Sequence, residues 1–277
     1  MSAPRSLVAA TDIDVLPEDR VIEQRDGYLL VRSPSNPTHY WGNYLLFDDA
    51  PSPGDAPRWE AWFDAEFGQE PRVRHRAFTW DRTGSGSEAE LDEFARRGYV
   101  SEESVGLVAR ADRVRAHPRE NRQVVVRALD PAAGADEEQW SAIVELQVAG
   151  REQGQDEPGY RAYSRARLGD LRALFRAGRG AWFVAVEPAR GEVVAGCGVV
   201  VTDGRGRFQA VDTALDYRRR GICSRLVVDA ARLSADLYRA ERFVIVADAG
   251  YHALGLYESL GFEEEERTFG VCLRPRE

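Results

Sequence analysis

The stretch that decides the fold is Leu215-Asp-Tyr-Arg218-Arg219-Arg220-Gly221-Ile222-Cys223-Ser224. An apolar run predicts a strand before it, and apolar residues spaced by three and four between Ile222 and Leu237 predict a helix after it. A strand that turns sharply into a helix leaves backbone N–H groups unpaired, with the positive end of the helix dipole behind them. Such a turn favours phosphate binding, and the alternative is an ordinary capped helix beside a solvated arginine cluster.

Working outward from this turn, the apolar periodicities predict further strands and helices. Toward the carboxyl end they predict a strand at 242–247, a short helix at 253–260 and a strand at 268–273. Toward the amino end they predict a strand at 124–126, helices at 136–153 and 162–177, and strands at 182–187, 192–202 and 208–215. The predicted order is therefore β-α-α-β-β-β-α-β-α-β.

The first 115 residues predict strands at 28–32, 40–47 and 74–80 and helices at 58–67 and 88–97. Phe94-Ala-Arg-Arg-Gly98-Tyr99 parallels Tyr257-Glu-Ser-Leu-Gly261-Phe262, which indicates a faint internal repeat. Two unrelated helices that each end at a glycine and an aromatic residue explain the parallel equally well. The polar stretch 109–123, with five arginines and a proline, is the predicted linker between two domains.

Composition excludes several classes of protein. The chain of 277 residues carries a net charge of −9, which disfavours nucleic acid and anionic membranes as partners. Its apolar stretches are too short to span a membrane and it opens on no secretory signal, so a cytoplasmic location is expected. Three cysteines without a CxxC pair and four scattered histidines predict no metal site. No lysine occurs, which excludes lysine-dependent mechanisms.

The turn resembles the signature of the GNAT superfamily of acetyl-coenzyme-A-dependent N-acetyltransferases, Arg/Gln-x-x-Gly-x-Gly/Ala. Arg218 and Gly221 match it, and Cys223 stands where the superfamily has glycine or alanine. A second block, 253–262, resembles Asn-x-x-Ala-x-x-Leu-Tyr-x-x-x-Gly-Phe, with Gly250 where the asparagine would stand. The resemblance covers residues 122–275 and implies a mixed, mostly antiparallel sheet flanked by helices, an α/β (α+β) fold. Residues 1–115 would then be a degenerate GNAT-like domain and residues 122–277 the GNAT domain.

The resemblance implies a role for each residue of the turn. Acetyl-coenzyme A (acetyl-CoA) would be the co-substrate, with Thr213 nearest its thioester and Leu215 beside the pantetheine. Tyr257 would stabilise the departing thiolate by a hydrogen bond, and a core aromatic is the alternative reading. The residues expected around the cofactor are Thr213, Leu215, Arg218, Arg219, Arg220, Gly221, Ile222, Cys223, Ser224 and Gly250.

The group that removes the proton from the acceptor amine is the least determined. Asp212 and Asp248 are candidates, although a surface or capping role for Asp212 and a loop cap for Asp248 are the favoured alternatives. Tyr160 and Tyr163 lie where this fold shapes its acceptor site. The run Glu263–Glu266 predicts a solvated turn.

These residues support three hypotheses. The leading one is transfer of an acetyl group to a primary amine of a small molecule or peptide, by a monomer or homodimer. The second is a catalytically inactive sensor or scaffold that binds coenzyme A (CoA), which the departures at Cys223 and Gly250 favour. The third, nucleic-acid binding through the arginine-rich linker, is disfavoured by the acidic total charge.

Overall fold

The structure is a computed structural model that describes residues 4–81, 88–151, 154–250 and 253–275. The chain folds into two compact units, here called unit 1 and unit 2. Unit 1 is formed within Met1–Gly106, Val246–Tyr251 and Glu265–Glu277, and unit 2 within Leu107–Ile245 and His252–Glu264. The units thus do not follow the two halves of the sequence, and the division into domains 1–115 and 122–277 stays a prediction.

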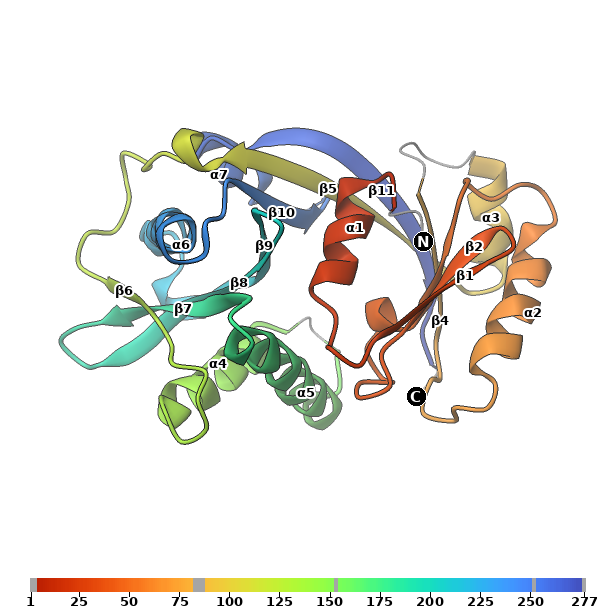
Figure 1. Ribbon diagram of the computed structural model, residues 1–277, viewed down its shortest axis with the longest axis horizontal. Helices are drawn as coiled ribbons and strands as arrows, with labels where there is room; N and C mark the ends of the chain where they lie inside the picture. Colours follow the sequence, from red (N-terminus) through yellow and green to blue (C-terminus); the bar gives the residue numbers. More distant parts are fainter. Residues whose placement is uncertain (1–3, 82–87, 152–153, 251–252, 276–277) are drawn as a thin grey trace. The chain divides into compact units, whose positions relative to one another are not determined.

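Unit 2 is a sheet with helices on both faces. Its strands are β6 (Val125–Ala128), β7 (Gly180–Glu187), β8 (Glu192–Thr202), β9 (Arg205–Thr213) and the first part of β10 (Arg242–Asp248). Its helices are α4 (Glu137–Gly150), α5 (Glu157–Arg176), α6 (Ile222–Tyr238) and α7 (Leu254–Ser259). Neighbouring strands run antiparallel except β9 and β10, and α6 lies on the opposite face of the sheet from α4 and α5 (Figure 1).

The strands of unit 1 pair in the order β1-β2-β3-β4-β11. Its strands are β1 (Val21–Arg25), β2 (Tyr28–Arg32), β3 (Tyr44–Phe47), β4 (Arg76–Trp80) and parts of β5 (Val100–Arg110) and β11 (Glu263–Leu273). Its helices are α1 (Leu7–Asp14), α2 (Asp55–Phe67) and α3 (Glu88–Arg96). β3 and β4 run parallel, and the last strand of the chain, β11, pairs antiparallel with β4.

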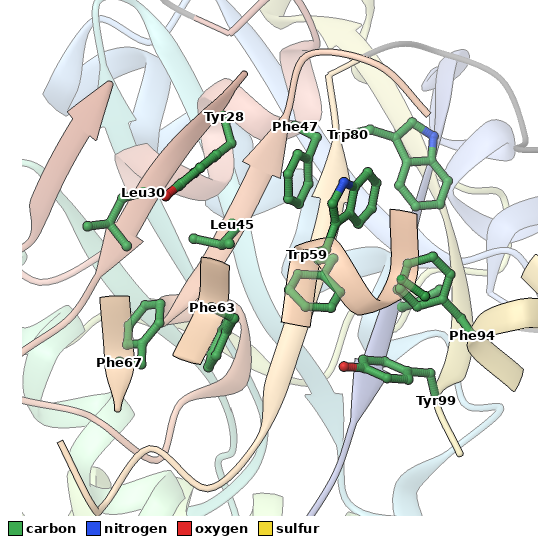
Figure 2. Close-up of a cluster of buried hydrophobic side chains, with 13 residues drawn as sticks. Tyr28, Leu30, Leu45, Phe47, Trp59, Phe63, Phe67, Trp80, Phe94 and Tyr99 are labelled. Atoms are coloured by element: carbon green, nitrogen blue, oxygen red, sulfur yellow. The ribbon is translucent and has the colours of Figure 1, made fainter. Parts of the chain in front are cut away.

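The period of two along the strands of unit 1 separates two apolar cores. Leu30, Leu45 and Phe78 face a core of aromatic rings beneath α2, which Figure 2 shows. Their neighbours Leu29 and Leu46 face a second core that includes Ala9 of α1. A sheet covered on both faces explains why β2 and β3 are apolar at nearly every position.

The mixed α/β fold expected from the sequence is confirmed, and most predicted elements occur within a few residues of their expected bounds. The helix α1 and the strand β1 were not predicted. Two predictions are wrong. Glu263–Glu266 opens the strand β11 and is not a turn, and the stretch 109–123 packs within unit 2 and is not a free linker. Residues 152–153, the expected end of α4, lie outside the described residues.

The ring stack at the centre of the aromatic core predicts where unit 1 is most sensitive. Trp59 is 2% exposed and stacks on Phe47 with ring centroids 3.6 Å apart. Trp59→Ala should therefore lower the free energy of unfolding by about 3–5 kcal/mol, measured by denaturant unfolding. Trp62→Ala is the matched control, because Trp62 lies one turn further along α2 and is only half-buried. It should lower the free energy of unfolding by less than half as much. Equal losses in both variants would contradict this assignment of the core.

Candidate active site

The turn between β9 and α6 presents a set of backbone amides at the start of a long helix. Gly221 is the N-cap residue with φ 74°, and Arg219 also has positive φ, at 58°. The first bond of the helix runs from the Arg225 N–H to the Gly221 carbonyl, at 3.2 Å. The amides of the first turn, residues 222–224, consequently have no partner within the helix and carry its positive dipole end.

The arginines of the turn make different contacts. Arg218 donates from Nε to the Thr213 carbonyl at 3.2 Å, which ties the turn to the end of β9. Arg220 stacks its guanidinium 5.1 Å from the ring centre of Tyr217. All three arginines are exposed, so their positive charge is available to an anion from solvent.

Gly221 is required because another segment of the chain passes close beside it. A Cβ atom built on it would lie 2.0 Å from the Arg119 carbonyl oxygen, so the chain itself occupies the space beside this glycine. Its positive φ adds strain for any side chain. A substitution of Gly221 would therefore disturb the fold as well as the turn, and it cannot isolate ligand binding.

The strand before the turn carries an irregularity. β8 and β9 pair as Gly198↔Gln209 and then as Gly196↔Asp212, so β9 has one extra residue between these pairs. Ala210, in this bulge, has φ 45°, which is uncommon for a residue with a side chain. Bulges of this kind often lie beside active sites, where they redirect a strand.

The same strand loses its parallel neighbour halfway along. In the part of the chain that the structure describes, β10 pairs with β9 from Arg242↔Arg205 to Val244↔Arg207 and no further. The edge of β9 from Phe208 to Thr213 therefore has no strand partner on that side. An edge of this kind offers backbone N–H groups to a carbonyl oxygen.

Asp212 lies on this part of β9, directly opposite Gly196 of β8. Burial raises the pKa of its carboxyl group from the ordinary 3.8 to about 6, against the lowering effect of the Arg218 charge. A carboxylate with a pKa near 6 is ionised at neutral pH and can still accept a proton efficiently. Asp212 thus has the properties of a general base.

Cys223, the residue that departs from the superfamily signature, remains a neutral thiol. Burial, and secondly the negative charge of Asp212, raise its pKa to about 12. The side chain therefore adds no negative charge to the turn and cannot repel an anion there.

The comparisons with known proteins agree with the fold. Residues 178–264 match the model of the acetyltransferase (GNAT) domain. The chain contains a GNAT domain. No curated protein matches the sequence.

Several solved structures share the fold across nearly the whole chain. A protein of unknown function from Staphylococcus epidermidis has a TM-score of 0.74 at 13% identity, covering 93% of this chain and 95% of that one. A GCN5-related N-acetyltransferase from Kribbella flavida has a TM-score of 0.65 at 14% identity, covering 100% and 97%. A tandem GNAT protein from the clavulanic acid biosynthesis pathway has a TM-score of 0.54 at 14% identity, covering 100% and 91%.

The remaining residues expected in the GNAT site lie on other elements. Tyr257 is in α7, is 3% exposed, and packs edge-on to Phe262 with ring centroids 6.4 Å apart. Tyr160 and Tyr163 lie together in the first turns of α5, with ring centroids 6.0 Å apart. The structure thus gathers Asp212, Thr213 and the turn 218–224 around one strand end, with Tyr257 on a separate helix of unit 2.

Asp248, the last residue of β10, and Gly250, in the turn that follows, both belong to unit 1. The Gly250 N–H donates to the Asp248 carboxylate at 2.7 Å, so Asp248 caps its own turn. This contact supports the capping role that the sequence left open for Asp248.

The described residues include neither a membrane-spanning helix nor a group of metal ligands. No helix among them combines the length and apolar character that crossing a membrane requires. No group of three or more His, Cys, Asp or Glu side chains within the described ranges could hold a metal ion.

Sequence reasoning missed two features of the GNAT site. The bulge at Ala210 gives no signal, because alanine is not typical of positive φ. The approach of Arg119 to Gly221 joins residues far apart in the sequence. The available signal was Gly221, a glycine directly before a helix. It indicated the close approach of a ligand, whereas in the structure the backbone of Arg119 lies beside it.

The raised pKa of Asp212 predicts a dependence of stability on pH. Between about pH 4 and 6 the folded chain holds a proton that the unfolded chain has lost, so stability falls as the pH rises and stays lower above pH 6. Asp212→Asn removes this cost. The variant should exceed the wild type in free energy of unfolding by about 3 kcal/mol at pH 8 and by less than about 1 kcal/mol at pH 4.

The measurement is denaturant unfolding at the two pH values. Asp216→Asn, which removes the same charge from the exposed turn after β9, is the control and should show no such difference. A constant offset between wild type and Asp212→Asn at both pH values would contradict the burial of an ionised Asp212.

Proposed function

We propose that the protein is an acetyl-CoA-dependent N-acetyltransferase that transfers the acetyl group to a primary amine. The observation that carries this proposal is the juxtaposition of an amide-lined turn with the unpaired edge of β9. Both features are needed to hold a thioester whose other end carries a pyrophosphate. The match of residues 178–264 to the GNAT domain supports the same chemistry.

The turn 218–224 fits the pyrophosphate of CoA. The amides at the start of α6 supply hydrogen-bond donors, and the exposed arginines supply positive charge in an otherwise acidic chain. Leu215, 56% exposed beside the turn, offers an apolar surface to the pantetheine arm. Acetyl-CoA, when bound, supplies the activated acyl group, and all other steps belong to the protein.

The edge of β9 is the place for the thioester. Its N–H groups between Phe208 and Thr213 would stabilise negative charge as the carbonyl oxygen becomes an oxyanion. The bulge at Ala210 changes the direction in which these groups point. Asp212, on the same segment, is then within the reach of an amine that approaches the thioester.

Two residues, Asp212 and Tyr257, would assist the movement of protons and electrons during acetyl transfer. Asp212 accepts the proton from the ammonium form of the acceptor, which frees the nitrogen lone pair for attack on the carbonyl carbon. The carbon–sulfur bond then breaks and its electron pair leaves on sulfur, to which Tyr257 donates a hydrogen bond. The nitrogen of the adduct loses its second proton as the amide forms, and this proton neutralises the thiolate, while the proton held by Asp212 returns to solvent.

A CoA-binding sensor or scaffold without turnover is the second candidate. The departure at Cys223 was the sequence argument for it. Because the thiol is neutral, this departure gives no electrostatic reason for weak binding. A panel of amines tested for acetyl-CoA consumption separates the two functions, since a sensor binds CoA and consumes none.

Unit 1 lacks the features that make the turn of unit 2 a site, which supports a silent amino-terminal half. Its parallel strands β3 and β4 stay paired to Phe47↔Trp80, and the Asp81 N–H continues the ladder by donating to the Phe47 carbonyl at 2.8 Å. The loop that follows β3 carries Asp48 and Asp49 and no arginine. A closed strand pair and an acidic loop both argue against a second pyrophosphate site of the same kind.

Calorimetry with CoA tests the cofactor site. We expect one molecule bound per chain, with affinity about tenfold weaker in Arg219→Ala because a charge beside the pyrophosphate is lost. Arg232→Ala removes the same charge from an exposed position further along α6 and should bind like the wild type. Two molecules per chain, or equal affinity in both variants, would overturn the assignment.

The role of Tyr257 is tested by removing only its hydroxyl group. Tyr257→Phe should lower kcat by about 100-fold with an acceptor found in the amine panel, because the thiolate loses its hydrogen-bond donor. The affinity for CoA should change little, since the ring that packs on Phe262 remains. Full activity in the variant would leave Tyr257 as a core aromatic residue.

A further inference from the structure

A strap formed by residues 111–121 crosses the functional elements of unit 2. Ala111 donates its N–H to the Glu241 carbonyl at 2.8 Å, immediately before β10. Arg115 donates its N–H to the Leu260 carbonyl at 2.9 Å, at the end of the helix that carries Tyr257. The strap then reaches the turn before α6. It is thus bonded to the elements that carry the proposed chemistry.

The backbone of the strap passes very close to two glycines, Gly221 and Gly261. Gly221 and Gly261 both have positive φ, at 74° and 98°. A Cβ atom on Gly261 would lie 2.4 Å from the Arg113 carbonyl oxygen, and one on Gly221 would lie 2.0 Å from that of Arg119. Both glycines are therefore needed because the backbone of the strap occupies the space of a side chain.

Asn121, the last residue of the strap, bonds to two consecutive carbonyl groups of the turn. Its backbone N–H donates to the Gly221 carbonyl at 3.0 Å, and its Nδ2 donates to the Arg220 carbonyl at 3.1 Å. Its Oδ1 accepts from the backbone N–H groups of Gln123 and Val124 at 2.9 and 3.1 Å. These bonds fix the rotamer of the side chain on both sides.

Because the peptide bond is planar, a hydrogen bond that fixes a carbonyl group also fixes the direction of the N–H group in the same plane. In a trans peptide the C=O and N–H bonds point in opposite directions. The Arg220 carbonyl shares its plane with the Gly221 N–H, and the Gly221 carbonyl shares its plane with the Ile222 N–H. By holding both carbonyls, Asn121 aims both N–H groups away from the strap.

We propose that Asn121 is a positioning residue for the cofactor turn, one that orients the Gly221 and Ile222 amides toward the pyrophosphate of CoA. The inference rests on the proposed function and adds a residue outside the turn to it. The arginine-rich strap is then part of the cofactor site through its contacts with the turn, while its own side chains need not touch the ligand.

The test compares CoA affinity by calorimetry in the full chain. Asn121→Asp keeps the Oδ1 acceptor for residues 123 and 124 but replaces the Nδ2 donor by an oxygen that faces the Arg220 carbonyl. CoA should bind at least about tenfold more weakly, the effect of one lost hydrogen bond together with a misdirected amide. Gln123→Glu places the same charge two residues away, at an exposed site, and should change affinity by less than about twofold.

Hydrogen exchange provides a readout that a general loss of stability would not reproduce. In the wild type, saturating CoA should protect the Gly221 and Ile222 amides. In Asn121→Asp the added protection of the Gly221 amide should fall, because the Nδ2 bond to the Arg220 carbonyl is lost. The Ile222 amide, whose peptide plane is held by the backbone N–H groups of Asn121 and Arg225, and the strands of unit 2 should exchange as before. If Asn121→Asp does not fold, Asn121→Ser, which is smaller and uncharged, takes its place with the same expectation.

The outcomes separate this inference from the proposed function. If the wild type fails to bind CoA, the proposed function is wrong and this inference falls with it. If the wild type binds CoA and the Asn121 variants bind it equally well, only the positioning role is overturned. Equal weakening by Gln123→Glu and Asn121→Asp would also overturn it, because charge alone would then explain the effect.

Discussion

The candidate site depends on where the parallel pairing of β9 and β10 stops. Among the described residues, β9 pairs with β10 from Arg205 to Arg207, and the edge of β9 beyond them has no strand partner on that side. Unit 1 has the same strand–helix–strand crossover, from β3 through α2 to β4, but its ladder continues to the end of β3. Both ladders contain three residue pairs, so the two pieces of topology differ in where the ladder ends, and this difference leaves an open strand edge beside the turn in unit 2.

Aromatic packing explains why the pair in unit 1 stays closed. Phe47, the last residue of β3, is stacked on Trp59 and surrounded by rings from α2 and β4 (Figure 2). Parting the strands at this end would expose that stack to water, at a cost set by its large apolar area. In unit 2 the corresponding end of β9 has Asp212 and Thr213, which are polar and only partly buried. The apolar end of one strand favours closure, and the polar end of the other favours an open edge.

The sequence predicted the helices and strands of unit 2 and the turn before α6 because both depend on local periodicity and on one glycine. Three features could not be predicted. The positive φ of Ala210 follows from pairing with β8, the burial that raises the pKa of Asp212 follows from tertiary packing, and the last strand of the chain completes the sheet of unit 1. Each depends on residues distant in the sequence, which periodicity does not relate.

The predicted linker shows how a polar composition can mislead. The stretch 109–123 contains arginines and a proline, which are typical of exposed connections, and most of its side chains are indeed exposed. Its backbone nevertheless forms bonds to Glu241, Leu260 and Gly221. Amino-acid composition predicts whether side chains are exposed. It does not predict backbone hydrogen bonds, and these hold the strap in place. The signal for such a segment therefore lies in its partners: glycines with positive φ, at 221 and 261, stand where the strap passes. In this protein the glycine that matches the GNAT signature is required by the packing of the chain, and the proposed role in ligand binding falls to the amides of the turn.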